Sequence, residues 1–314
     1  MNNKLKTHLP FYSFAIIAIF IVTSFTPTKN SEISSQTPPQ KLDIQGHRGA
    51  RGLYPENTVT AFIEAVKLGV NTLEMDVIVS KDSQLVVSHE AWMSDEICTK
   101  PNGELVEKDA AAKYNLYKMN YAEIKQYDCG MRVHPRFLTQ KKLPEHKPLL
   151  SEVITKVEAF IKENKLPPII YSIETKSEPK DDGIFNPAPK TFVRLLYTEL
   201  KKQNILNRII IQSFDVRTLQ ELRKVDPKIK TSFLVENTTG LKSNLAQLGF
   251  DPTIYSPDFN LINDTLVKDL HQKNILLIPW TVDEISDMKR LVNMGVDGII
   301  TDYPDRAINL FNKK

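Results

Sequence analysis

The 314-residue chain has little net charge and few cysteines. Its formal charge is +3, and residues 1–27 hold two lysines and no acids, so the rest of the chain carries about +1 by subtraction. Such near-neutrality argues against nucleic acid and against a membrane surface held by a polybasic segment as partners. The two cysteines are Cys98 and Cys129, and no Cys or His lies at zinc-like spacing near the acidic residues discussed below.

The apolar run near the N-terminus is too short to span a bilayer, which takes about 20 residues. It covers the 15 residues Phe11–Phe25 and follows Lys4 and Lys6, as in a signal peptide. We therefore expect residues 1–27 to direct export, to a periplasm or out of the cell. No cysteine follows the run, which excludes a lipid-modified cysteine anchor. No clear A-x-A cleavage site is present either, so the alternative is an uncleaved anchor that tethers the protein to the membrane.

Residues 28–40 are rich in Ser, Thr and Pro and are predicted to be a flexible linker. The composition of the whole chain, 41% hydrophobic and 25% charged, is that of an ordinary globular protein. From Leu42 onward, strand-like and helix-like segments alternate. The predicted strands are 42–46, 72–79, 169–176, 208–213, 230–235, 253–257, 275–280 and 297–301.

Eight such units in about 270 residues suit a (β/α)8 TIM barrel, in which active sites gather at the C-terminal ends of the strands. We predict this α/β barrel over residues 41–314, with an insertion at about 91–148 after the second strand. The insertion is too long for a connecting loop and is rich in Tyr, Lys, Asn and Pro.

We expect the insertion to cap the pocket and to govern substrate choice rather than chemistry. Its tyrosines and Trp92 are the side chains expected to shape the pocket, and replacing its tip, residues 102–109, is expected to change the ranking of substrates. Both cysteines lie within it. In an oxidising compartment they can form one disulfide, but the spacing is equally compatible with two separate thiols.

Two acids mark the second predicted strand. Side chains alternate along a strand, so Glu74 and Asp76 project to the same face. Two carboxylates on a mostly apolar strand are costly to bury unless a cation neutralises them. Mg²⁺ or Ca²⁺ is the natural partner, because both ions prefer oxygen ligands.

Several motifs in the chain occur in a set order. They are HRGARGLYPENT from His47, LEMDV, VVSHE, IETK from Ile173, QSFD from Gln212, PWTVDE from Pro279 and GVDGIITDYPD from Gly295. Together they resemble the signature of the glycerophosphodiester phosphodiesterases and span nearly the whole chain after the linker. One departure is visible: the family more often has His-Asp where this chain has His89-Glu90.

This resemblance implies a metal-dependent enzyme that hydrolyses glycerophosphodiesters to glycerol 3-phosphate and an alcohol. Its partner is then a small-molecule glycerophosphodiester, and its cofactor is one divalent cation, Ca²⁺ or Mg²⁺. The candidate catalytic residues are His47 and His89. The candidate metal ligands are Glu74, Asp76 and Glu174, and the candidate substrate-binding residues are Arg48, Lys176, Phe214 and Trp280.

In the implied mechanism, a glycerol hydroxyl attacks phosphorus and gives a cyclic phosphate that water opens. We expect His89 to act first as base and His47 as acid. Three carboxylates, one divalent ion, Arg48 and Lys176 sum to +1, which complements a phosphodiester monoanion. The alternatives are a related enzyme for lysophospholipid, phosphoinositol or teichoic-acid-like substrates, and a non-catalytic protein that binds phosphorylated polyols.

Other polar residues have structural interpretations. Asn57 is predicted to cap the helix that runs to about Leu68. Glu56 either touches the substrate and metal region or favours the N-terminus of that helix. His134 and His146 are expected to be solvated, and His271 to be structural.

Overall fold

The computed structural model describes residues 9–10, 42–108 and 113–312, and the chain divides into two units, residues 1–39 and 40–314. Apart from residues 9–10, the predicted export segment and linker lie outside the described residues. None of the helices in the described part is long and apolar enough to cross a membrane.

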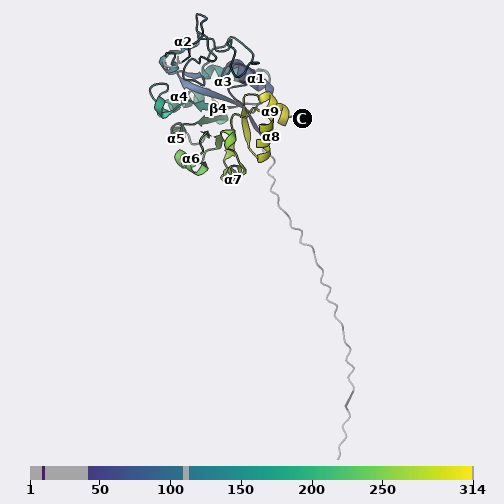
Figure 1. The fold of residues 1–314 in the computed structure, drawn as a ribbon. Coiled ribbons are helices and arrows are strands. Elements are labelled where there is room, and N and C mark those ends of the chain that lie inside the picture. The colour runs from purple at the N-terminus through teal and green to yellow at the C-terminus, as the bar shows by residue number, and fades with distance from the viewer. Residues whose placement is uncertain (1–8, 11–41, 109–112, 313–314) are drawn as a thin grey trace, which may run out of the picture. The chain divides into compact units, whose positions relative to one another are not determined.

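Parallel strands form a barrel in the second unit, as the sequence predicts (Figure 1). In the described residues, eight strands pair in parallel in the order β8-β7-β6-β5-β4-β2-β1-β9. Their bounds are β1 Asp43–Gly46, β2 Thr72–Val79, β4 Ile170–Thr175, β5 Ile209–Ser213, β6 Lys230–Val235, β7 Ile254–Pro257, β8 Leu276–Leu277 and β9 Gly298–Thr301.

Backbone hydrogen bonds also bridge the short strand β8 and β9. The amide of Asp297 donates to the carbonyl of Leu277, and that of Ile300 donates to Pro279, each at 2.9 Å. The amide of Val282 returns a bond of 2.9 Å to Ile300. These bonds satisfy edge groups that an open sheet would expose, and so they complete the barrel.

A helix follows each of these strands or the loop after it, and the helices surround the strands (Figure 1). Their bounds are α1 Val59–Leu68, α3 Leu150–Glu163, α4 Pro189–Lys202, α5 Val216–Val225, α6 Leu241–Leu248, α7 Asp264–Gln272, α8 Ile285–Met294 and α9 Pro304–Phe311. Short 3-10 turns are η3 Pro179–Asp181, η4 Leu206–Arg208 and η5 Phe259–Leu261. Helix α4 shows how the apolar side of a helix covers the strands. Its residues Phe192, Leu196 and Leu200 recur every fourth position and are buried against the sheet.

Side chains alternate along β2, so its apolar residues lie in the core and its acids lie in the candidate site. Leu73, Met75 and Val77 point outward into the main hydrophobic core between strands and helices. Glu74 and Asp76 consequently point into the barrel. The register of β2 against β4 then places Asp76 directly beside Glu174.

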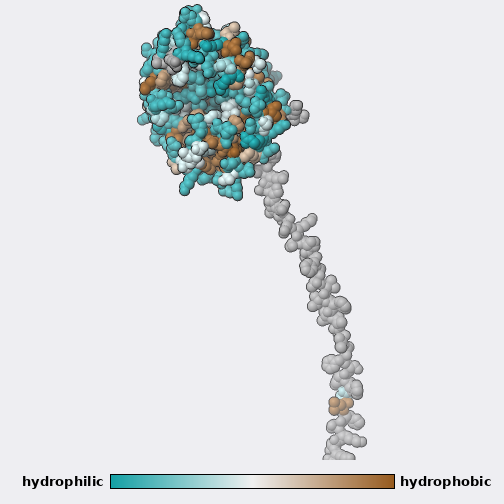
Figure 2. All heavy atoms as spheres, viewed as in Figure 1, coloured by the Kyte–Doolittle hydropathy of each residue, from teal (hydrophilic) through white to brown (hydrophobic). Residues whose placement is uncertain are grey.

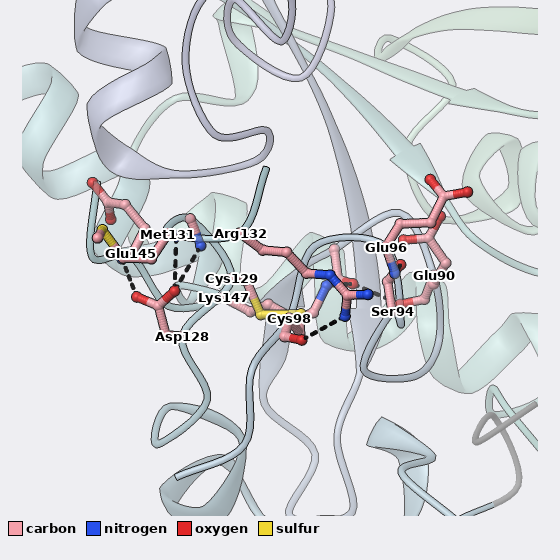
Figure 3. Close-up of a disulfide and its surroundings, with 12 residues drawn as sticks. Glu90, Ser94, Glu96, Cys98, Asp128, Cys129, Met131, Arg132, Glu145 and Lys147 are labelled. Carbon is pink, nitrogen blue, oxygen red and sulfur yellow. Dashed lines mark hydrogen bonds between the residues drawn. A yellow bond between two sulfur atoms is a disulfide. The ribbon is translucent and has the colours of Figure 1, made fainter. Parts of the chain in front are cut away.

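The insertion starts after a short strand that the sequence analysis did not predict. This strand, β3 Leu85–Val87, runs antiparallel to β2. The insertion itself contains η2 Leu116–Lys118 and α2 Tyr121–Ile124, and its apolar side chains form a small cluster with Ile78 of β2 and Val86 of β3. Cys98 and Cys129 form a disulfide within that cluster, which decides between the two possibilities left open by the spacing (Figure 3).

The end of the insertion is tied back to the barrel. Within the insertion, the amide of Cys129 donates to the carbonyl of Glu145 at 2.7 Å. At its end, the amide of Val87 in β3 donates to the carbonyl of Pro148 at 2.8 Å, which joins the insertion to the strand that precedes His89.

Candidate active site

Three buried carboxylates converge inside the barrel. Glu74 and Asp76 come from β2 and Glu174 from β4, and one oxygen of each lies within 4.8 Å of the others. The Oδ1 atom of Asp76 is buried and has no hydrogen-bond partner among the described residues. A buried oxygen without a partner is rare unless something else satisfies it.

The protonation of these acids reflects their crowding. Burial, followed by the charges of Asp76 and Glu174, raises the pKa of Glu74 well above its usual range. Burial also raises the pKa of Glu174. For Asp76, burial alone would raise the pKa, but Arg48, His89 and Lys176 together lower it.

A divalent cation fits this donor set. Three carboxylates that repel one another and one unsatisfied oxygen are what Mg²⁺ or Ca²⁺ would neutralise. All three residues are those predicted from the sequence as metal ligands, and the structure brings them together.

Two predicted cations lie beside the acids. The guanidinium of Arg48 donates from Nη1 to Glu56 Oε1 at 2.7 Å, and its Nε lies 3.3 Å from Asp76 Oδ2. The ammonium of Lys176 donates to Glu174 Oε1 at 2.8 Å and lies 3.8 Å from Asp76 Oδ1. Both cations also line the cavity described below, so they are available to a phosphate group.

The turn after β1 explains the glycine in the HRG motif. Gly49 has φ +88°, and a Cβ atom there would lie 2.7 Å from the backbone carbon of Ala61 in α1. Only glycine allows the turn to pack this closely on the helix. The packed turn aims the backbone amide of Arg48 at Glu74 Oε2, at 2.8 Å.

His47 follows β1 and pairs with an acid from the far end of the chain. Its Nδ1 lies 2.6 Å from Asp302 Oδ1, which leaves Nε2 as the free ring nitrogen, 3.9 Å from Glu74 Oε2. Burial lowers the pKa of His47 to about 4, although the charge of Asp302 opposes this. The order in which the two histidines act as base and acid stays a prediction.

His89 follows β3 and has the same arrangement. Its Nδ1 lies 2.8 Å from Glu90 Oε1, so Nε2 is again the free nitrogen. The pKa of Glu90 would be raised by burial, but the bond to His89 lowers it to about 2. Glu90, the departure from the usual His-Asp pair, thus turns back onto the preceding ring. The turn is held by Ser88, whose hydroxyl donates to the carbonyl of Glu90 at 2.6 Å and accepts from Lys147 at 2.8 Å.

A cavity of about 1050 Å³ joins these groups. Both histidines, Arg48, Lys176, Glu74 and Glu174 line it. Phe214 and Trp280 line it too and pack edge to face, with ring centroids 5.4 Å apart. Trp92 of the insertion forms a second such pair with Phe185, at 5.6 Å.

Figure 2 shows the unit's surface, on which hydrophilic residues predominate.

Comparison with known proteins identifies the family of this chain. Residues 47–306 match the sequence model of the glycerophosphoryl diester phosphodiesterase family. A glycerophosphodiester phosphodiesterase of Caldanaerobacter subterraneus subsp. tengcongensis is 31% identical over 273 residues, which are 87% of this chain and 99% of that protein. The chain belongs to the glycerophosphoryl diester phosphodiesterase family.

Two further proteins are similar to this phosphodiesterase chain, one in sequence and one in fold. A glycerophosphodiester phosphodiesterase of Bacillus subtilis is 28% identical over 317 residues, covering 95% of this chain and 97% of that protein. The structure of an Oleispira antarctica phosphodiesterase in complex with the product sn-glycerol-3-phosphate has the same fold, with a TM-score of 0.69 at 20% identity, covering 86% of this chain and 97% of that one.

Some contacts in the site of this phosphodiesterase chain were not predicted from the sequence. Asp302 lies in the GVDGIITDYPD motif at a strand end, but its pairing with His47 joins residues 255 positions apart. Glu56 holds Arg48 rather than serving the helix. Asn57 does not cap α1: Thr58 is the N-cap and accepts from the amide of Ala61. Asn57, with φ +56°, instead donates to Asp76 Oδ2 at 2.9 Å.

The expectations for the other histidines were partly wrong. His134 is buried, with 3% of its surface exposed, because it packs between Glu56 and Phe137. His146 is partly exposed beside Glu152, and His271 pairs with Asp297 at 3.0 Å.

The insertion lies beside the cavity with only some of the residues expected to shape it: Trp92 lines the cavity, as expected, and the described tyrosines do not. Ala91, Trp92 and Arg136 line the cavity, whereas no tyrosine of the insertion and none of residues 102–108 does so in the described part of the chain. The described residues of the tip are therefore not part of the cavity lining. More of the lining comes from the loop 177–186 after β4.

Proposed function

We propose that this protein is a metal-dependent phosphodiesterase that hydrolyses glycerophosphodiesters to glycerol 3-phosphate and an alcohol. The observation that carries the proposal is the lining of one cavity by two histidines, each with a free Nε2, together with the carboxylate cluster and two cations. This set supplies proton transfer, metal binding and anion binding at one place.

Glu74, Asp76 and Glu174 are the residues that would hold the divalent ion, Mg²⁺ or Ca²⁺. When bound, such an ion neutralises charge that develops on the phosphoryl oxygens. Arg48 and Lys176 bind the phosphodiester anion beside it, and each is already anchored by an acid. Phe214 and Trp280 face the glycerol part of the substrate with apolar ring surface.

The histidines move the protons. The glycerol hydroxyl next to the phosphate attacks phosphorus and gives up its proton to one imidazole Nε2. The bond from phosphorus to the alcohol oxygen breaks, and that oxygen takes a proton from Nε2 of the other ring, which enters the step as an imidazolium and leaves it neutral. In the second step water opens the cyclic phosphate and the two imidazoles exchange roles. The carboxylates of Asp302 and Glu90 orient the rings by accepting at Nδ1.

Release of glycerol 3-phosphate by the purified protein tests the proposal. Several glycerophosphodiester head groups would be compared, with and without EDTA and with Mg²⁺ or Ca²⁺ added back. His47→Ala and His89→Ala serve as controls for contaminating activity. Binding of glycerol 3-phosphate without turnover of any head group would contradict the proposal that the protein is an enzyme and would favour a phosphopolyol-binding protein. Turnover only with lysophospholipid or phosphoinositol substrates would change the substrate class and leave the chemistry in place.

We also propose that the protein works outside the cytoplasm. The sequence of residues 1–27 supports export, and the disulfide is of the kind that persists in oxidising compartments. Cell fractionation with N-terminal sequencing of the mature protein distinguishes a cleaved signal peptide from a membrane tether. Full-length protein in the cytosolic fraction would contradict export.

A further inference from the structure

Arg51 is buried beside the site but has no part in the proton transfers above. Its guanidinium is 4% exposed and donates two hydrogen bonds to Asp302, from Nε to Oδ1 at 2.9 Å and from Nη2 to Oδ2 at 2.7 Å. The same Oδ1 accepts from His47 Nδ1 at 2.6 Å. A bidentate pair fixes the plane of a carboxylate, so Arg51 sets the direction in which Asp302 holds the histidine.

The insertion in turn holds Arg51. The ring of Phe137 packs on the guanidinium, with 5.1 Å from Cζ to the ring centroid, and Phe137 is 7% exposed. The side-chain amide of Gln140 donates to the backbone carbonyl of Arg51 at 2.6 Å. The amide of Lys141 donates to the carbonyl of Leu53 at 2.9 Å. Residues 134–141, which we call the clamp, thus contact both ends of Arg51.

The clamp also reaches the residue that holds Arg48. His134 Nδ1 accepts from the backbone amide of Arg136 at 3.1 Å, so in the neutral ring the proton is on Nε2. That Nε2 lies 3.6 Å from Glu56 Oε2, and the other oxygen of Glu56 accepts from Arg48. Arg51 Nη1 lies 3.8 Å from the same Oε2. One buried network therefore connects the clamp with both His47 and Arg48.

We propose that Arg51 is a positioning residue for His47, and that the clamp, by holding Arg51 and Glu56, keeps His47 and Arg48 in their reacting positions. The insertion thus supports the chemistry itself, in contrast to the expectation that it governs only substrate choice. The proposal rests on the proposed function for its kinetic readout, and it has a spectroscopic readout that does not.

Two variants of the full-length, metal-loaded protein test the two links. Arg51→Ala should lower kcat by roughly 10- to 100-fold, as is typical when a supporting partner is lost, and change KM little. Because Arg51 lines the cavity, added guanidinium can reach the vacated space. At millimolar concentration, far below that which unfolds proteins, it should restore part of kcat, whereas equal urea should not. A purely structural defect would not respond in this way.

Phe137→Leu tests the clamp while keeping an apolar side chain in place. It should lower kcat by roughly threefold to tenfold. The matched control is Phe250→Leu, which removes another ring that packs on an arginine, Arg223, at 4.5 Å and outside the cavity lining. The control should keep the kcat of the wild-type protein, and thermal unfolding of all variants checks that they are folded.

The proton between His47 Nδ1 and Asp302 should give a low-field proton NMR resonance, assigned by its loss in His47→Ala. It should shift or broaden in Arg51→Ala and Phe137→Leu and persist in Phe250→Leu. This readout needs no turnover, so a wild-type protein without activity would overturn the proposed function but leave this inference testable. An unchanged resonance and kcat in Phe137→Leu would overturn the clamp, and a loss in Arg51→Ala that guanidinium does not relieve would overturn the role of Arg51.

Discussion

The disulfide between Cys98 and Cys129 allows the sharpest prediction of stability. It closes a loop of 31 residues in the insertion. Figure 3 shows how its surroundings are joined: Arg132 reaches the carbonyl of Cys98, and the carboxylate of Asp128 accepts from the amides of Met131 and Glu145. The segment after Cys129 is the one that leads into the clamp.

The magnitude follows from loop closure. For 31 residues, the chain-entropy relation gives about 12 cal/mol/K, or about 3.7 kcal/mol at 25 °C, lost from the free energy of unfolding when the bond is removed. With an unfolding entropy of roughly 2.1 cal/mol/K per residue over residues 40–314, this lowers Tm by about 6 °C. Activity at 25 °C should survive, because a domain of this size is commonly stable by about 5–15 kcal/mol.

The measurement compares thermal unfolding of the wild-type protein, with and without a reducing agent, with that of the double variant Cys98→Ala/Cys129→Ala. The reduced wild-type protein and the double variant should melt together, and the double variant should not respond to the reductant. A fall in Tm of less than about 2 °C in both the reduced wild-type protein and the double variant would refute the loop-closure reasoning.

The remaining predictions concern the site. His47→Ala and His89→Ala should each lose about 10²- to 10⁴-fold in kcat while remaining folded by circular dichroism, and wild-type turnover in either would remove that residue from the acid-base pair. EDTA should abolish activity and Mg²⁺ or Ca²⁺ should restore it better than Zn²⁺; full activity in protein that elemental analysis shows to be metal-free would contradict this. Glu174→Gln should weaken metal binding measured by calorimetry, and unchanged affinity would exclude it as a ligand. Trp92→Ala should change the ratio of the KM values for different head groups by up to about tenfold, since an edge-to-face pair is lost. A Gly-Ser replacement of residues 102–107 should leave kcat/KM within about twofold. The opposite pattern would restore the role first expected of the tip.

The alternation of strands and helices and the acids on β2 could be predicted because they depend on local patterns, while the resemblance to the family made the barrel specific. Alternation with a period of two places Glu74 and Asp76 on one face whatever the rest of the chain does. The repeated change from strand to helix likewise predicts eight units, and the strand bounds differ from the structure by a few residues. His47 and His89 were identified because both belong to motifs that resemble the signature of the family.

The partners of these residues depend on the path of the chain in three dimensions. The pairing of His47 with Asp302 requires that the last strand close against the first, which no local pattern expresses. Glu174 meets Asp76 only through the register of β4 on β2. His134 has a polar neighbourhood in sequence and was expected to be solvated, yet the insertion folds it against Glu56 and buries it. Sequence by itself thus determined which side chains share a face of a strand, since that follows from backbone geometry. Tertiary structure decided which remote groups meet, since that follows from barrel closure and from the packing of the insertion.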